Sequence, residues 1–235
     1  MTNRIETPLI VGNPFSPTGR GSTALSFLRA FKAAQHPIPI KDIYSYGHVI
    51  DRSIITETES NLVNNLSKSV NIYHINLDEV EPALAALNNK LPDGAYNIIY
   101  PFWELSKMPA IWIDKLKLFD EVWAPSKFIL STIKCAVSMP VYHMPLPVEV
   151  KLDAFLGRQY FGLPYGSYIF LLFFDFRSYI NRKNPQALIH VFEKVCSARP
   201  ADDIRVVIKV HGEDSSLQAM KDFQDFVSRI HASRY

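Results

Sequence analysis

Three cations gather in one segment of the second half of the chain. The segment Asp175–Pro185 contains Arg177, Arg182 and Lys183, and a predicted helix follows it directly. Cationic side chains next to the N–H groups of a helix N-terminus suit a diphosphate ligand. Lys209, near the end of the next predicted strand, is expected to add a further cation. A solvated basic loop is the alternative interpretation, and Lys209 then extends into water.

Two glycines, Gly19 and Gly21, lie next to the start of a predicted helix in the first half of the chain. Glycines at such a place let backbone N–H groups approach an anion closely, and the helix dipole favours its charge. The spacing does not match the six-residue dinucleotide fingerprint, because Ala24 stands where its third glycine belongs. A tight loop without a ligand is the alternative.

His74 and Glu104 are the candidate catalytic side chains. His74 lies at the end of a predicted strand, where it is suited to carry a proton or to hydrogen-bond a sugar hydroxyl. Glu104 is the one carboxylate in an apolar stretch, so it must be paired, exposed or used. A structural histidine and a helix-capping or ion-paired glutamate are the alternatives.

Other kinds of chemistry find no support in the sequence. It contains no nucleophile elbow, no Walker loop and no metal-ligand spacing, so we expect neither a metal nor a cofactor. Its two cysteines, Cys135 and Cys196, are far apart and predict no disulfide framework, which favours the reduced state of a cytoplasmic protein. A net charge of +2 argues against a nucleic-acid partner.

Membrane-spanning segments are not predicted either. The N-terminus has no apolar signal core. The most apolar run, Tyr168–Phe174, is far shorter than the roughly 20 residues that a bilayer requires. Peripheral contact with a membrane stays open.

Strand and helix signals alternate through residues 1–150. They predict an α/β fold in which a doubly wound, Rossmann-like parallel sheet is joined by right-handed crossovers. Ser22 and Ser126 are expected to cap helices, the second of which is Lys127–Cys135. Six strands are predicted here: Leu9–Gly12, Ile38–Tyr44, Val70–Ile75, Tyr96–Trp103, Glu121–Ala124 and Pro140–Met144.

Residues 151–235 predict a second unit with only two strands. Tyr168–Phe174 is apolar enough for a central parallel strand that is buried on both faces, and Ile204–Val210 is the next strand. Asn184 is expected to cap the helix between them. A two-stranded parallel sheet buries little apolar surface. We therefore expect an incomplete second Rossmann-like lobe, which either docks on the first or belongs to a truncated chain, and we favour truncation.

Two stretches resemble a known family when they are taken together and in this order. The stretch from Tyr100 to Phe128 contains PFWELSKMPAIWIDKLKLFDEVWAPSKF, and Phe174–Pro185 is FDFRSYINRKNP. They are similar to the GT-B-fold retaining glycosyltransferases of glycosyltransferase family 4, of the bacterial polysaccharide and lipopolysaccharide type. The resemblance covers the first lobe and about the first third to half of the second.

The resemblance implies two Rossmann-like lobes, with a nucleotide-diphosphate sugar held mainly by the second and a glycan or lipid-linked acceptor held mainly by the first. It implies that Lys183 contacts the donor diphosphate, that Gly19 and Gly21 cradle it, and that His74 lies close to the transferred sugar. The family's partner arginine corresponds to a serine here, so the neighbouring Arg177 is its candidate substitute. The acidic Glu-x7-Glu segment of the family is missing.

A glycosyltransferase, or a truncated form of one, is therefore the leading hypothesis for function. It would transfer a sugar to a hydroxyl acceptor in glycan biosynthesis, with retained configuration. The alternative is a non-catalytic module that binds a glycan or a partner, because a chain without the donor-base pocket is expected to be inactive alone. A nicotinamide- or nucleotide-binding domain of another type is a third hypothesis, disfavoured by the missing third glycine and the missing ribose-binding acid.

Overall fold

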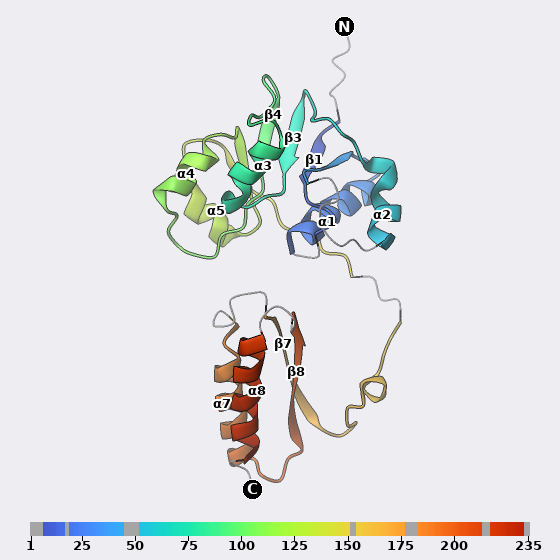
Figure 1. Ribbon diagram of the computed structural model, residues 1–235, viewed down its shortest axis with the longest axis vertical. Helices are drawn as coiled ribbons and strands as arrows, with labels where there is room; N and C mark the ends of the chain where they lie inside the picture. Colours follow the sequence, from blue (N-terminus) through green and yellow to red (C-terminus); the bar gives the residue numbers. More distant parts are fainter. Residues whose placement is uncertain are drawn as a thin grey trace. The chain divides into compact units, whose positions relative to one another are not determined.

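The computed structural model describes residues 7–16, 19–44, 52–150, 154–176, 183–212 and 217–232. The chain divides into two compact units, Met1–Lys151 and Leu152–Tyr235, and each is described by itself. Figure 1 labels their helices and strands in chain order.

The first unit is an α/β domain with a six-stranded parallel sheet that helices flank, which is a Rossmann-like arrangement. The strand order is β2-β1-β3-β4-β5-β6, and every neighbouring pair is parallel. The six strands predicted from the sequence are confirmed, with narrower bounds at four of them. They are β1 (Leu9–Gly12), β2 (Ile40–Asp42), β3 (Val70–Tyr73), β4 (Tyr96–Ile99), β5 (Glu121–Ala124) and β6 (Val141–His143).

The two faces of this sheet carry two separate hydrophobic cores, because neighbouring strand residues point to opposite sides. Leu9 and Val11 belong to the larger core, whereas Ile10 between them belongs to the smaller one. Each such side chain contributes about 1.5–3 kcal/mol through its burial. Helix α1 (Gly19–Ala33) covers the smaller core. The larger core is covered by α3 (Val80–Ala86), α4 (Ala110–Leu116) and α5 (Lys127–Lys134).

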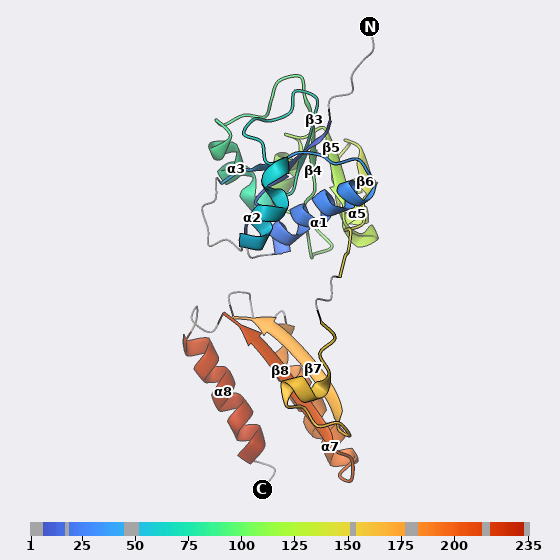
Figure 2. The same cartoon turned by 90° about the vertical axis from the view of Figure 1, so that its right-hand side faces the viewer.

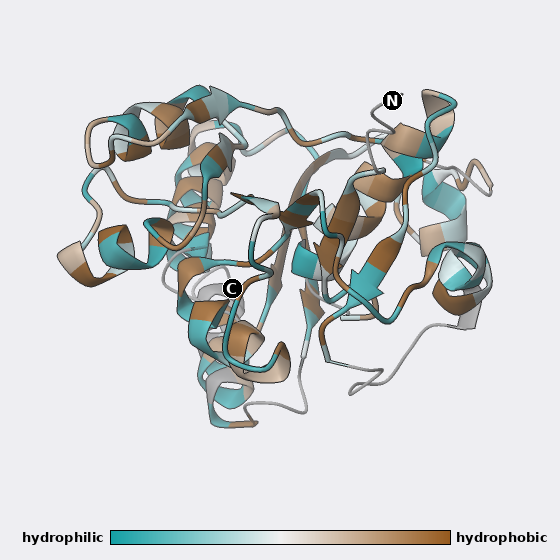
Figure 3. Ribbon diagram, turned by 90° about the horizontal axis from the view of Figure 1, so that it is seen from above, coloured by the Kyte–Doolittle hydropathy of each residue, from teal (hydrophilic) through white to brown (hydrophobic). Residues whose placement is uncertain are grey.

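Two short helical segments, α2 (Arg52–Thr58) and η1 (Glu59–Asn61), follow β2, and η2 (Leu77–Glu79) leads into α3. Arg29 of α1 holds Glu57 of α2 through two hydrogen bonds of 2.6 and 2.7 Å. In the view of Figure 3, hydrophobic colours run along the strands, while the helices alternate between hydrophobic and hydrophilic residues. This distribution is typical of a hydrophobic sheet on which helices pack with one side.

The start of α1 differs from the prediction. The helix begins at Gly19, so Ser22 lies within its first turn and is not its N-cap. The helix also packs closely on the preceding loop, because a Cβ atom on Gly21 would lie 2.2 Å from the carbonyl oxygen of Ser16. Ser126, in contrast, caps α5 as predicted, since its side chain accepts the N–H of Ile129 at 3.2 Å.

Buried amides tie β3 to β4 near the strand starts. Asn71 donates to the side-chain oxygen of Asn97 at 3.3 Å, and Asn97 donates to the carbonyl of Ala95 at 3.1 Å. The hydroxyl of Tyr73 also donates to Asn97, at 3.4 Å. Because these buried groups satisfy one another, they fix the register of the two strands.

The second unit contains β7 (Tyr168–Asp175) and β8 (Ile204–His211), paired in parallel over their whole length. Two helices, α7 (Pro185–Ala198) and α8 (Leu217–Ala232), cover one face of this pair (Figures 1 and 2). The short helix η3 (Arg158–Phe161) lies on the opposite side. Asn184 caps α7 as predicted, because its side chain accepts the N–H of Ala187 at 3.2 Å.

The prediction that β7 is buried on both faces is wrong for the described residues. Leu171 is 63% exposed and Phe173 is 66% exposed, whereas Phe174 on the other face is 4% exposed. Phe174 packs edge-on against Phe223 of α8 at 5.3 Å between ring centroids. In the described part of the chain the uncovered face has no helix layer, so its apolar side chains meet solvent. None of the described helices is long and apolar enough to cross a membrane.

Candidate functional site

The first unit has its topological switch point between β1 and β3, because the chain leaves β1 toward β2 on one side and returns to β3 on the other. Ligands of doubly wound sheets bind beyond the carboxyl ends of the strands at such a point. His74 directly follows β3 there, and its backbone N–H donates to the carbonyl of Val11 at 2.8 Å. A small crevice at this point is lined by Arg20, Thr23, His74, Ile75, Asn76, Tyr100 and Phe102.

His74 is buried without a polar partner. Its side chain is 3% exposed, and neither ring nitrogen has a hydrogen-bond partner among the described residues. The ring packs against Phe27 at 4.7 Å and against Tyr100 at 5.2 Å between centroids. Burial lowers the pKa of His74 from 6.5 to about 3, so the imidazole is neutral at physiological pH. A neutral ring offers one donor and one acceptor, which favours hydrogen bonding to a ligand over proton transfer.

Three polar residues frame the mouth of the crevice. The side-chain oxygen of Asn76 accepts the N–H of Phe102 at 2.9 Å, which ties the end of β3 to the segment after β4. The N–H of Asn76 donates to Glu79 at 2.9 Å, and Glu79 forms an ion pair with Arg20 at the start of α1. The space inside is too narrow even for a water molecule. A ligand that reaches His74 must therefore displace side chains that line the crevice.

The structure places Gly19 and Gly21 in the first turn of α1, beside this crevice rather than in a separate loop. Gly19 is exposed, and a Cβ atom there would contact nothing within 4 Å. Its carbonyl accepts the hydroxyl of Thr23 at 2.7 Å. Position 21 must be a glycine, because the carbonyl oxygens of the preceding loop leave no space for a Cβ atom there. Of the two glycines, only Gly19 has open space where a Cβ atom would be.

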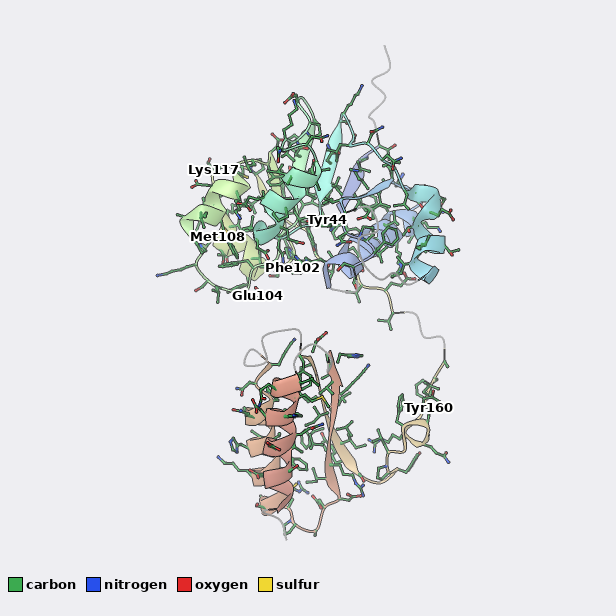
Figure 4. The ribbon with its side chains drawn as sticks, viewed as in Figure 1. Tyr44, Phe102, Glu104, Met108, Lys117 and Tyr160 are labelled. Atoms are coloured by element: carbon green, nitrogen blue, oxygen red, sulfur yellow. The ribbon has the colours of Figure 1, made fainter. Side chains whose placement is uncertain are left out.

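Glu104 is exposed and does not line the His74 crevice. It lies in the segment between β4 and α4, whose neighbouring Trp103 packs on Trp112 at 4.6 Å between ring centroids. The indole N–H of Trp103 donates to the carbonyl of Lys107 at 3.1 Å. Figure 4 shows Glu104 with Phe102 and Met108 along one edge of the first unit. The structure therefore does not bring the two candidate catalytic residues into one crevice.

The second unit brings Lys183 and Lys209 together. Both line an open hollow of about 540 Å³ at the carboxyl ends of β7 and β8, together with Asp175 and His211, which pair in register. Leu171, Phe173 and Phe174 form its apolar wall. Two ammonium groups beside a helix N-terminus suit an anionic ligand. Arg177 and Arg182, the other two predicted cations, lie outside the described residues.

Sequence reasoning missed several residues of both sites. Arg20 and Asn76 frame the first crevice, and Asp175 and His211 line the second hollow. The last three follow or end a strand, so reading every polar residue at a strand end would have found them. The ion pair between Arg20 and Glu79 joins residues far apart in the sequence, so no local sequence pattern predicts it. No cluster of three metal-binding side chains occurs in the described part of the chain.

Comparisons with known proteins do not identify a family. No protein-family model matches the chain, and a search of curated proteins finds no match. The resemblance to glycosyltransferases therefore stays a prediction that rests on the residues themselves.

Proposed function

We propose that this chain is a glycosyltransferase, or part of one, that transfers a sugar from a nucleotide-diphosphate sugar to a hydroxyl acceptor with retained configuration. One observation carries the proposal: Lys183 and Lys209, distant in sequence, line the same hollow at the strand ends of the second unit. The two cations would bind the donor diphosphate. They would stabilise its negative charge as the bond from the sugar to the phosphate breaks.

The first unit would supply the acceptor side. Its buried, neutral His74 would hydrogen-bond a hydroxyl of the sugar, because a hydroxyl can accept from the protonated ring nitrogen or donate to the other one. The acceptor is a glycan or a lipid-linked sugar in this proposal. Both cysteines are free, which agrees with a cytoplasmic setting.

A non-catalytic binding module is the second candidate, and the closed crevice around His74 favours it. With no space beside the imidazole and with Glu104 on the surface, the described first unit presents no assembled acid–base pair. In that case the first unit would bind a glycan or a partner protein. Saturable glycan binding without any donor affinity would support this candidate.

The test is a thermal-shift titration of the full chain with UDP, GDP and their sugar conjugates. A ligand that binds only the native state stabilises it by about 2.7 kcal/mol at one hundred times its Kd. We expect one nucleotide to raise the melting temperature and Lys183→Ala to remove that rise. The matched control is Lys194→Ala, which removes an exposed lysine of α7 outside the hollow and should keep the rise.

Two results would count against the donor site. If no nucleotide changes the melting temperature, the second unit holds no donor and the binding-module candidate is favoured. If both lysine variants weaken the shift equally, the effect comes from net charge rather than from the hollow.

A further inference from the structure

Three neighbouring strands of the first unit end with Asp42, Gly12 and His74 side by side. Asp42, the last residue of β2, pairs in register with Gly12, the last residue of β1. On the other side of β1, Val11 pairs with Tyr73, and the N–H of His74 donates to the carbonyl of Val11 at 2.8 Å. His74 therefore follows β3 at the level of Gly12, and the three residues form a row across β2, β1 and β3.

This row lies on the face of the sheet that α1 covers. Ile10 and Ile40, each two residues before a member of the row, belong to the smaller core under α1. Residues two apart along a strand point to the same face. The ring of His74 also packs against Phe27 of that core, at 4.7 Å between centroids. The carboxylate of Asp42 and the imidazole of His74 consequently share one face of the sheet.

Gly12 leaves the middle of the row without a side chain. A Cβ atom on Gly12 would lie 3.3 Å from the Cβ of His74, which confirms that the two positions are adjacent on one face. Neighbouring strands are about 4.8 Å apart, so the Cα atoms of Asp42 and His74 are about 10 Å from each other. Two hydrogen bonds of about 2.8 Å, with a vicinal diol between them, nearly fill such a separation.

Asp42 has the place of a sugar-binding acid in a doubly wound sheet. In nucleotide-binding sheets, an acid that follows the first helix and ends the next strand accepts a ribose hydroxyl. Asp42 is 8% exposed, and its Oδ1 accepts the N–H of Tyr44 at 3.1 Å, which occupies one of the roughly four acceptor positions of a carboxylate. The sequence did not reveal this acid, because the predicted strand continued to Tyr44, whereas β2 ends at Asp42.

His74 is an independent sign of a ligand. It is 3% exposed, and neither ring nitrogen has a hydrogen-bond partner among the described residues. Buried polar groups are almost always hydrogen-bonded, so an exception needs a cause, and a ligand supplies one. Burial lowers the pKa of the imidazole to about 3, which keeps it neutral at physiological pH. One ring nitrogen then donates and the other accepts, and a hydroxyl can pair with either.

We propose that the first unit binds the vicinal diol of a sugar ring, with one hydroxyl on Asp42 and the other on His74. The carboxylate accepts the first hydroxyl, and the neutral imidazole pairs with the second. The ring is the ribose of a nucleotide or a unit of the acceptor glycan, and only the second source rests on the proposed function. The crevice at His74 is too narrow for a water molecule, so lining side chains move when the sugar enters.

Nitrogen NMR of the histidine rings measures the contact with His74 directly. In the full chain with isotope-labelled histidine, the resonance that is missing from His74→Leu is that of His74. Two series of probes are titrated: UDP and GDP against their 2′-deoxy forms, and the methyl glycosides of glucose, galactose and mannose against their monodeoxy analogues. We expect a diol-bearing probe to shift the His74 resonance, and its deoxy analogue to bind about tenfold more weakly or worse.

Asp42→Asn tests the carboxylate. It keeps an oxygen that can accept the N–H of Tyr44 but removes the charge, and it should weaken binding of the same probe about tenfold or more. The matched control is Asp78→Asn, which makes the same replacement at an exposed acid of η2 and should leave the affinity unchanged. Circular dichroism and melting of each variant establish that its fold is retained. His74→Leu needs no buried hydrogen bond, so it should fold and also weaken the probe in a thermal-shift titration.

The outcomes are distinct. A shift of the His74 resonance by UDP or GDP identifies a nucleotide, and a shift by a methyl glycoside identifies the acceptor glycan. The proposal is overturned if no probe moves the resonance, or if Asp42→Asn binds the probe as tightly as Asp78→Asn does. Lys183→Ala tests the donor site of the second unit separately, so a failure here leaves that site untouched.

Discussion

His74 should make the stability of the first unit depend on pH in a defined window. Burial lowers the pKa of its imidazole from 6.5 to about 3 in the folded state, and only the unfolded chain regains the ordinary value. Between these values the unfolded state binds a proton that the folded state does not. Stability is therefore complete above about pH 6.5 and is lost as the pH falls toward 3.

The magnitude follows from proton linkage. Taking 6.5 for the unfolded imidazole, the loss between pH 7.5 and pH 5.0 is about 2 kcal/mol for this one group. The variant His74→Leu lacks the titrating ring and should lack this loss. At pH 7.5 it should also be more stable by about 1–3 kcal/mol, because it removes buried polar atoms without partners.

Urea unfolding of the wild type and of His74→Leu at several pH values measures the difference. Other ionisable groups contribute alike to both proteins, so the difference isolates His74. The control variant is His36→Leu, which makes the same replacement at an exposed histidine. A wild-type and a His74→Leu curve that stay parallel from pH 7.5 to 5.0 would refute the argument, since His74 would then be protonated equally in both states.

Two further predictions concern packing. Gly21→Ala should destabilise the fold by about 1–3 kcal/mol, because its Cβ would lie 2.2 Å from the carbonyl oxygen of Ser16; Gly19→Ala in the same turn meets nothing and should stabilise the helix by about 0.5–1 kcal/mol. Equal effects of the two variants in thermal unfolding would contradict the packing argument. Asn97→Ala should cost about 1–3 kcal/mol in urea unfolding, since it removes the side-chain oxygen that accepts from both Asn71 and the hydroxyl of Tyr73; a change below about 0.5 kcal/mol would show that the strands do not depend on these contacts.

The strands of the first unit could be predicted because their signals are local. Each has an apolar run that ends at a proline, glycine or polar residue, and the alternation of strands and helices limits the topology to parallel crossovers. The start of α1 could not be predicted in this way. Ser22 has the right type for an N-cap, but the helix begins at Gly19, and Gly21 lies against the carbonyl of Ser16. That contact comes from tertiary packing and has no counterpart in local propensity.

The candidate site residues likewise differ in how far local sequence signals predict their positions. Reading the ends of the strands and the segments after them proposed His74, Lys183 and Lys209, and the structure gives the two lysines a common hollow. It also proposed Glu104, which the structure leaves exposed and outside the His74 crevice. A carboxylate in an apolar stretch is buried only if the whole stretch is buried. Here Trp103 is buried, whereas the adjacent Glu104 is exposed. The burial of individual residues in a connecting segment depends on which side faces the sheet, and the sequence does not encode this as a period.

The closed crevice and the imidazole without hydrogen-bond partners among the described residues occur at the same residue, His74. A folded unit that buries two ring nitrogens without partners gives up stability, which a ligand that hydrogen-bonds them would restore. Arg20 lines this crevice and forms an ion pair with Glu79. An anionic ligand at the start of α1 would compete with Glu79 for the guanidinium and expose the way to His74 in the same step. Under the proposed function, binding of the charged part of a substrate would thereby precede recognition of the sugar hydroxyl, so the order of binding follows from which polar group lies outermost.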